Sequence, residues 1–252
     1  MMIEIKPLLL GFPGKVKRGF LGWSSSFLIR KTTSSSQVPK MILYDTGGMN
    51  ERDKILHSLD DDGIAPDNID IVVLSHLHFD HAANWTLFKN AELYIHPEEI
   101  NPSEDYKDTA RLDFHRENLL RHPKINFVEE NDQIEGLDVI ELPGHTPGLI
   151  GLLTSNGILV SDAVKNRSEL EYGSLLNVWD KDLARQSIEK VKKLSDTIYP
   201  GHDVPVFKKG KEWVPLMSYQ EKIQFPTGIV NSDGKADIHL DFITKKEDEC
   251  HD

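Results

Sequence analysis

Residues 69–81 read IDIVVLSHLHFDH, an apolar run of strand length followed at once by four side chains of the kind that bind metal ions. The run is rich in β-branched residues, which favours a buried β-strand. In α/β proteins, strand ends at the edge of a sheet commonly carry the chemistry. This stretch therefore predicts a metal-dependent enzyme, with four candidate ligands in six residues: His76, His78, Asp80 and His81.

Three further strand ends carry side chains of the same kind. Rigid strand ends can bring ligands together from distant parts of a chain, so we expect all seven side chains to form one site. Imidazole and carboxylate suit zinc, iron or manganese, and seven ligands are too many for one tetrahedral ion. The three are His145 after the strand expected at 138–142, Asp162 at the end of 158–161, and His202 after 197–199.

The order of the predicted elements favours an α/β (α+β) fold, with two packed sheets covered by helices. We expect a single domain over residues 1–244 and a disordered, charged tail over 245–252. Helices are predicted at about 50–62, 83–89 and 180–194. The other predicted strands are 3–10, 20–30, 38–44, 69–74, 93–95, 125–128 and 149–154.

Residues 101–122 differ from the rest, because they are polar and carry charges of both signs. They are predicted to form a helical excursion with Ala110, Phe114 and Leu119 facing inward. An insertion just after a proposed site suggests a lid or a pocket wall. A solvated connecting helix is an equally good interpretation.

The formal net charge of −12 disfavours nucleic acid as a partner and leaves a small-molecule substrate as the expectation. Bound divalent cations would offset part of that charge locally, so a phosphate-bearing substrate stays open. The one cysteine, Cys250, excludes an internal disulfide. With no signal-peptide pattern and no membrane-length apolar run, we expect a cytoplasmic protein without a membrane anchor. The sequence makes no prediction of oligomeric state.

Five motifs in the right order, over about residues 20–207, resemble those of the metallo-β-lactamase superfamily. The resemblance implies a four-layer αβ/βα sandwich with two divalent metal ions at one edge, zinc first and iron or manganese as alternatives. The motifs are the Asp-Thr-Gly turn 45–47, His76-x-His78-x-Asp80-His81, Pro143 to Gly148 around His145, Ser161-Asp162, and Pro200-Gly201-His202.

The resemblance also implies a role for each ligand position. His76, His78 and His145 would hold the first ion, Asp80, His81 and His202 the second, and Asp162 would bridge both. A hydroxide shared by the ions would attack the substrate, and Asp80 would carry the proton to the leaving group. For Asp45 two roles stay open, turn formation and the orientation of a ligand histidine.

Departures from the superfamily patterns narrow the expected reaction. Asp162 stands where one group of β-lactam hydrolases has cysteine, and His78 where the oxygen-reducing diiron members have glutamate. Only 16 residues separate His145 from Asp162, too few for the extra domain usual in nuclease members. The closest similarity is to the lactonase-like branch and to small metallo-β-lactamase-domain-containing proteins. Where the lactonases carry a tyrosine, three residues after the bridging Asp, this chain has Lys165, which we expect to contact substrate.

The sequence thus favours a dinuclear metal-dependent hydrolase acting on an ester, lactone or thioester bond. A phosphodiesterase or ribonuclease at the same two-metal site is the first alternative. The others are a persulfide dioxygenase-like oxidoreductase with one iron, and a binding module that kept the fold without catalysis.

Overall fold

A computed structural model describes residues 2–16, 19–33, 36–111 and 113–221. The chain divides into one unit, Met1–Met217, and a second unit, Ser218–Asp252, of which only 218–221 are described. The predicted tail 245–252 and Cys250 lie outside the described residues, so the domain boundary at 244 stays a prediction. Among the described helices, none has the length and apolarity needed to cross a bilayer, and the longest, α6, has 14 residues.

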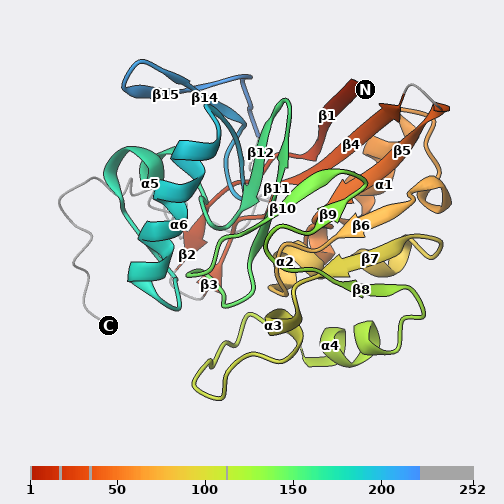
Figure 1. Cartoon of the computed structure of the whole chain (residues 1–252), viewed down its shortest axis with the longest axis horizontal. Coiled ribbons are helices and arrows are strands. Elements are labelled where there is room, and N and C mark those ends of the chain that lie inside the picture. Colours follow the sequence, from red (N-terminus) through yellow and green to blue (C-terminus); the bar gives the residue numbers. More distant parts are fainter. Residues whose placement is uncertain (1, 17–18, 34–35, 112, 222–252) are drawn as a thin grey trace, which may run out of the picture. The chain divides into compact units, whose positions relative to one another are not determined.

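The first of two large sheets is antiparallel at its start and parallel at its end (Figure 1). Strands β1, β4 and β5 pair antiparallel, and β5 to β8 pair parallel. Parallel pairing puts the ends of β5, β6 and β7 at one edge. The strands, in spatial order, are β1 (Met2–Leu9), β4 (Ser26–Thr33), β5 (Ser36–Tyr44), β6 (Ile71–Val73), β7 (Glu92–Ile95) and β8 (Ile125–Phe127).

The second sheet is antiparallel except for one parallel pair, β12 with β13. That pair brings the segments after both strands, with Asp162 and His202, to the same edge. The strands, in spatial order, are β15 (Glu212–Pro215), β14 (Val206–Lys209), β13 (Thr197–Pro200), β12 (Gly157–Ser161), β11 (Ile150–Thr154), β10 (Leu137–Glu141) and β9 (Gln133–Ile134).

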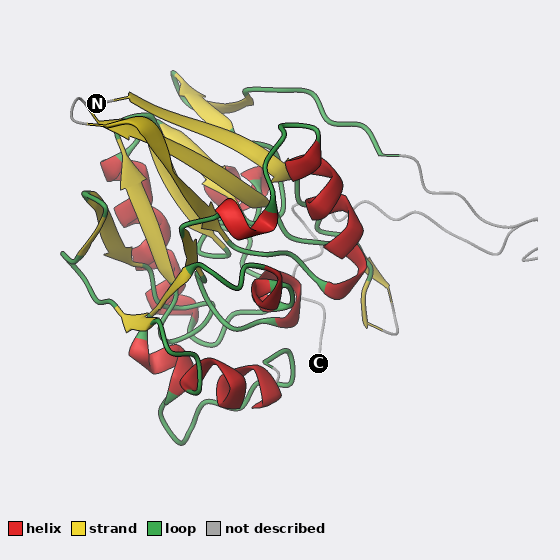
Figure 2. Ribbon diagram, turned by 90° about the vertical axis from the view of Figure 1, so that its right-hand side faces the viewer, coloured by secondary structure: helices red, strands yellow, loops and turns green. Residues whose placement is uncertain are grey.

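Three separate apolar cores show that the unit has four layers. One core joins α1 (Arg52–Asp60) to the first sheet through Ile55 and Leu59, and the second lies between the two sheets. The third joins the second sheet to α5 (Arg167–Tyr172) and α6 (Lys181–Leu194). Side chains alternate between the first two cores along β4 and β5, as the period of a strand requires. The predicted αβ/βα sandwich is therefore confirmed (Figure 2).

The predicted strand 20–30 is wrong in its first half. The chain instead forms a small hairpin, β2 (Lys15–Val16) with β3 (Gly19–Phe20), and β4 begins only at Ser26. Beside this hairpin Phe12 pairs with Trp23 through their backbones, and an added Cβ at Gly22 would lie 2.0 Å from the Phe12 carbonyl oxygen. This close approach turns the hairpin back on the preceding segment.

Two predictions of local detail also fail. The helix expected at 83–89 is a single 3₁₀ turn, η3 (Trp85–Leu87). The residue before it, Asn84, is fixed by side-chain hydrogen bonds that it donates to the Thr46 and Gly48 carbonyls. In α4 (Asp113–Leu120), Leu119 is buried as expected, but Phe114 is 56% exposed. The neighbouring His115 takes the inward position instead. The hairpin β14–β15 has no counterpart in the sequence prediction.

Candidate metal centre

The seven sequence-predicted ligands come together at the edge where the strands of both sheets end. The first four follow β6 and lie at the start of α2 (Phe79–Ala82), with His78 as its N-cap residue. The other three follow β10, β12 and β13. All are buried, none with more than 8% of its surface exposed: His76, His78, Asp80, His81, His145, Asp162 and His202.

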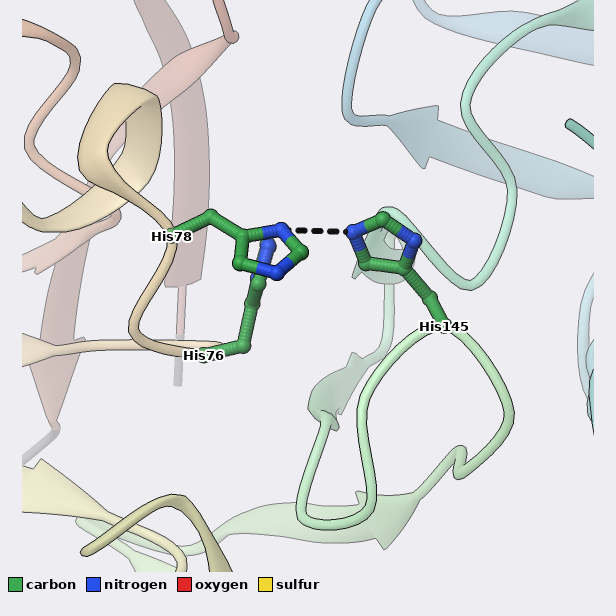
Figure 3. A group of neighbouring side chains, drawn as sticks. All are labelled: His76, His78 and His145. Carbon is green, nitrogen blue, oxygen red and sulfur yellow. Dashed lines mark hydrogen bonds between the residues drawn. The ribbon is translucent and has the colours of Figure 1, made fainter. Parts of the chain in front are cut away.

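Three groups of three side chains have the spacing of metal ligands, and one of them, His76, His81 and Asp162, lies across the other two. In the first, His76, His78 and His145 each place one nitrogen within 4.8 Å of the others. His78 Nδ1 and His145 Nε2 lie 2.9 Å apart, and the rings converge as Figure 3 shows. In the second, Asp80, His81 and His202 meet the same condition.

Asp162 lies between the two groups and faces both. Its Oδ2 is 3.2 Å from His145 Nε2, in the first group. Its Oδ1 is 3.2 Å from both His81 Nε2 and His202 Nε2, in the second. One carboxylate thus has an oxygen toward each group, the arrangement that a ligand shared by two ions requires.

Each of the five imidazoles has one ring nitrogen fixed by a protein group and the other turned toward the common centre. This is the usual arrangement for metal-binding histidine, because the outer hydrogen bond sets the tautomer and orientation of the ring. The outer partners are Ser75 Oγ for His76, Asp108 for His78, Asp45 for His81, the Asn177 carbonyl for His145 and the Trp23 carbonyl for His202.

Three of the ligand atoms that face the common centre have no hydrogen-bond partner among the described residues. In the part of the chain that the structure describes, His76 Nε2, His81 Nε2 and Asp162 Oδ1 are fully buried and make no hydrogen bond. Buried polar atoms without partners are costly and rare in native proteins, and these three point into a cluster of nitrogen and oxygen donors. Divalent metal ions at this centre would satisfy all three atoms.

The electrostatics of the centre also suit cations. Burial alone would raise the pKa of Asp162, but the imidazoles of His202, His81 and His145 hold it well below its usual range. Burial and the neighbouring rings of His81 and His78 hold the pKa of His76 well below its usual value. Burial lowers the pKa of His81 and of His202, but the Asp162 carboxylate more than offsets this effect and raises both pKa values above the usual range. Metal ions bound here would displace the protons of those two rings.

Asp45 lies behind the second group, in a left-handed conformation with φ of 58°. Its Oδ2 is 2.9 Å from His81 Nδ1, and its Oδ1 accepts a hydrogen bond of 2.8 Å from the Ser75 backbone N–H. The carboxylate therefore joins the end of β6 to the outer nitrogen of His81. This geometry combines both roles left open by the sequence, a strained turn and the orientation of a histidine.

Lys165 lies next to His202, whose backbone N–H donates a 2.7 Å hydrogen bond to the Lys165 carbonyl, and its side chain is 12% exposed. Its ammonium is 3.4 Å from Oε1 of the buried Glu169. Burial and the Lys165 charge together hold the pKa of His145 well below its usual value. The ammonium is thus near the centre, with one carboxylate already as its partner.

Two aromatic pairs lie next to the ligands. Phe20 of β3 packs edge-on against Phe79 at 6.3 Å and against His202 at 5.3 Å. Tyr106 meets Trp179 edge-on at 5.9 Å between ring centroids. Phe20, Phe79 and Trp179 are each 37–41% exposed, so part of each ring faces solvent.

Sequence reasoning missed Glu99, a buried carboxylate at the end of α3 (Pro97–Ile100). Its Oε2 accepts a hydrogen bond from the Leu77 N–H, at 2.9 Å. Its Oε1 accepts from Thr146 Oγ1 at 2.5 Å and from the Gly148 N–H at 3.0 Å. One side chain therefore joins the loop of His76 and His78 to the loop of His145. Nothing in the sequence around Glu99 signals this role, because its partners are distant in sequence.

We expect Glu99→Gln to lower the free energy of unfolding. Both oxygens of Glu99 accept hydrogen bonds, so the amide NH₂ of glutamine would place a donor against another donor. Burial raises the pKa of Glu99, and the Thr146 hydrogen bond opposes that rise. A lost charge-assisted bond and an unsatisfied donor cost about 2–3 kcal/mol, or about 5–10 °C in Tm for a unit of this size. Thermal melts of Glu99→Gln and of the exposed neighbour Glu98→Gln measure the difference. Equal Tm values for the two variants would contradict the role of Glu99.

Comparison with known proteins agrees with this geometry. Residues 25–202 match the model of the Metallo-beta-lactamase superfamily. A probable metallo-hydrolase of Methanocaldococcus jannaschii is 31% identical over 170 residues, 67% of this chain and 73% of that protein. An N-acyl homoserine lactonase of Bacillus thuringiensis is 28% identical over 166 residues, 62% of this chain and 64% of the lactonase. The solved structure of AidC, a dizinc quorum-quenching lactonase, superposes with a TM-score of 0.60 at 24% identity, covering 81% of this chain and 82% of AidC. At that identity the superposition shows a shared fold.

Proposed function

This chain belongs to the metallo-β-lactamase superfamily and is a metal-dependent hydrolase, and from that premise we propose that it binds two divalent ions and cleaves an ester, lactone or thioester bond. One observation carries the proposal: Asp162 lies between two groups of buried histidines, with an oxygen toward each. The lactonase relative and the dizinc neighbour support carboxylic ester chemistry and zinc.

In this proposal the two groups keep the roles that the sequence suggests. His76, His78 and His145 would hold one ion, Asp80, His81 and His202 would hold the other, and Asp162 would offer an oxygen to each. When bound, two such ions supply a water nucleophile of lowered pKa and a Lewis acid for the substrate oxygen. The outer hydrogen bonds keep the five rings oriented, so the residues need little rearrangement.

Asp80 is the group proposed to transfer a proton from the attacking water to the leaving group. Its Oδ2 lies 3.5 Å from His202 Nε2 and 3.7 Å from His81 Nε2, and the side chain is 10% exposed. The carboxylate is thus within the ligand cluster and reachable from solvent. It would accept the proton of the attacking water and give it to the leaving alkoxide or thiolate.

The substrate side of the proposal rests on Lys165 and the aromatic pairs. The partly exposed rings of Phe20, Phe79 and Trp179 suit an apolar acyl group. The Lys165 ammonium, beside His145 and 12% exposed, would stabilise the substrate oxygen as negative charge develops on it.

The test is a substrate panel on protein purified without chelator. We expect two metal ions per chain and turnover of an ester, lactone or thioester that stops when the ions are removed. In Lys165→Met we expect two ions still bound and kcat/KM lower by about 10²-fold, the typical loss of one donor to a developing oxyanion. Lys181→Met, at an exposed position of α6, serves as the matched control.

Each alternative has its own outcome in the same experiment. Turnover of bis(p-nitrophenyl) phosphate alone would favour phosphodiesterase or ribonuclease chemistry. One bound iron with oxygen consumption on glutathione persulfide would favour the oxidoreductase. Protein that binds no metal would revive the binding module and refute the proposal.

A further inference from the structure

The segment between α3 and α4, residues 101–111, is joined by its backbone to the loop that carries His78. The Phe79 N–H donates a 3.0 Å hydrogen bond to the Ala110 carbonyl. His78 and Arg111 face one another in an isolated antiparallel bridge. This part of the predicted lid or wall is therefore paired with the ligand loop.

Asp108 extends this attachment to the ring of His78. Its Oδ2 is hydrogen-bonded to His78 Nε2 and also accepts a 2.6 Å bond from the Tyr106 hydroxyl. Its Oδ1 accepts a 2.7 Å bond from the Ala110 N–H. Two donors of its own segment thus fix the carboxylate, which is 17% exposed, in contact with the histidine.

This contact has a chemical consequence for His78. Because an ionised carboxylate can only accept a hydrogen bond, Nε2 of His78 carries the proton and donates it in the hydrogen bond to Asp108. The lone pair of the ring then lies on Nδ1, the nitrogen 2.9 Å from His145 Nε2. His78 is the exception among the five rings, since the other four turn Nε2 toward the centre. Its use as a ligand therefore depends on a partner that holds the proton on Nε2.

Tyr106 connects the same carboxylate to the loop of His145. Its ring packs edge-on against the ring of Trp179. The backbone N–H of Trp179 donates a 3.3 Å hydrogen bond to the His145 carbonyl. The Asn177 carbonyl, two residues before Trp179, lies 2.8 Å from His145 Nδ1. The groups that orient His78 and His145 thus meet at the contact between Tyr106 and Trp179.

We propose that Asp108, held by Tyr106, is a positioning residue for the ion bound by His76, His78 and His145. It fixes the tautomer and direction of His78, and residues 101–111 thereby form part of the wall of the metal centre. The inference rests on the two-metal function proposed above.

The test is metal affinity rather than turnover alone. Wild type, Asp108→Ala, Asp108→Asn and Tyr106→Phe are loaded with zinc, and both dissociation constants are measured by competition with a chelating dye. For Asp108→Ala we expect one ion to bind about 10–100-fold more weakly, the usual effect of removing the outer partner of a ligand histidine. Asp108→Asn, whose amide oxygen can accept the same bond, is expected to recover part of the loss. Tyr106→Phe should show a smaller loss.

Two control variants show which of the two ions is weakened and whether the loss of the Asp108 contact causes the weakening. Asp105→Asn removes an exposed carboxylate of the same segment and should bind both ions as wild type does. His202→Ala removes a ligand of the other group, so the cobalt absorption spectrum of the Asp108 variants should differ from that of His202→Ala. Excess zinc should restore turnover in Asp108→Ala.

The results distinguish failure of the positioning role of Asp108 from failure of the two-metal proposal. Asp108→Ala with two wild-type affinities, or with both affinities weakened equally, overturns the positioning role. If Asp108→Ala does not fold, unchanged affinities in both Asp108→Asn and Tyr106→Phe overturn it instead. Wild-type protein that binds fewer than two ions refutes the two-metal proposal, whatever the variants do.

Discussion

Asp162→Asn is expected to release both metal ions and to lower kcat/KM by about 10⁴-fold or more, the scale for removing one member of a group that acts as a unit. The variant keeps the volume of the side chain but loses the charge and one acceptor oxygen. Asp162 has one oxygen toward each group, so its loss is expected to weaken both ions, whereas a histidine variant removes a ligand from one group.

Metal content by mass spectrometry and turnover of the preferred ester or lactone measure this result. Asp196→Asn is the matched control, because Asp196 is exposed and lies just before β13. It should keep two ions and full activity. Two ions in Asp162→Asn, with kcat/KM within tenfold of wild type, would contradict the bridging role.

Gly201→Ala is expected to displace the Asp162 carboxylate, because the added methyl group would clash with it. An added Cβ would lie 2.1 Å from Asp162 Oδ1 and 2.9 Å from the Ser161 carbonyl carbon. Neither can move aside, because Asp162 faces three histidines and the Gly201 N–H donates to the Ser161 carbonyl at 2.9 Å. Overpacking of this kind costs about 3 kcal/mol, or about 6–12 °C in Tm for a unit of this size.

We expect Gly201→Ala to lose metal as well as stability. Gly210→Ala provides the comparison, since its φ of +65° strains a side chain but its Cβ would meet nothing within 4 Å. Strain of that kind alone costs about 1–2 kcal/mol. Thermal melts and metal analysis of both variants distinguish the two causes. A Gly201→Ala protein that holds two ions and melts no lower than Gly210→Ala would refute the clash.

The sequence predicts those parts of the molecule in which local pattern and burial agree. The apolar run before His76 forms β6, and the alternation along 38–44 divides β5 between two cores, so the sandwich follows from strand patterns in order. The gathering of the seven ligand side chains also follows from their positions at strand ends. Their individual roles stay predictions until metal is measured.

The sequence could not predict features that depend on contacts between distant segments. Asp108 and Glu99 sit in polar, unremarkable surroundings, and their roles exist only because the fold brings His78, Leu77 and Gly148 against them. The strand expected at 20–30 begins only at Ser26, and before it the chain makes another contact between separate segments, the close approach of Gly22 to Phe12. The choice of His115 over Phe114 at the buried position of α4 likewise depends on the rotation of that helix.

Each group of three ligands draws on both sheets, and this has a thermodynamic consequence. His76 and His78 follow the first sheet and His145 the second, while Asp80 and His81 are completed by His202. Neither half of the unit alone carries all three ligands of either group, so binding and the assembly of the halves are linked equilibria. A hundredfold excess of free metal over the dissociation constant adds about 2.7 kcal/mol per site to the free energy of unfolding. The folded fraction of this enzyme in a cell should therefore rise and fall with the free metal concentration.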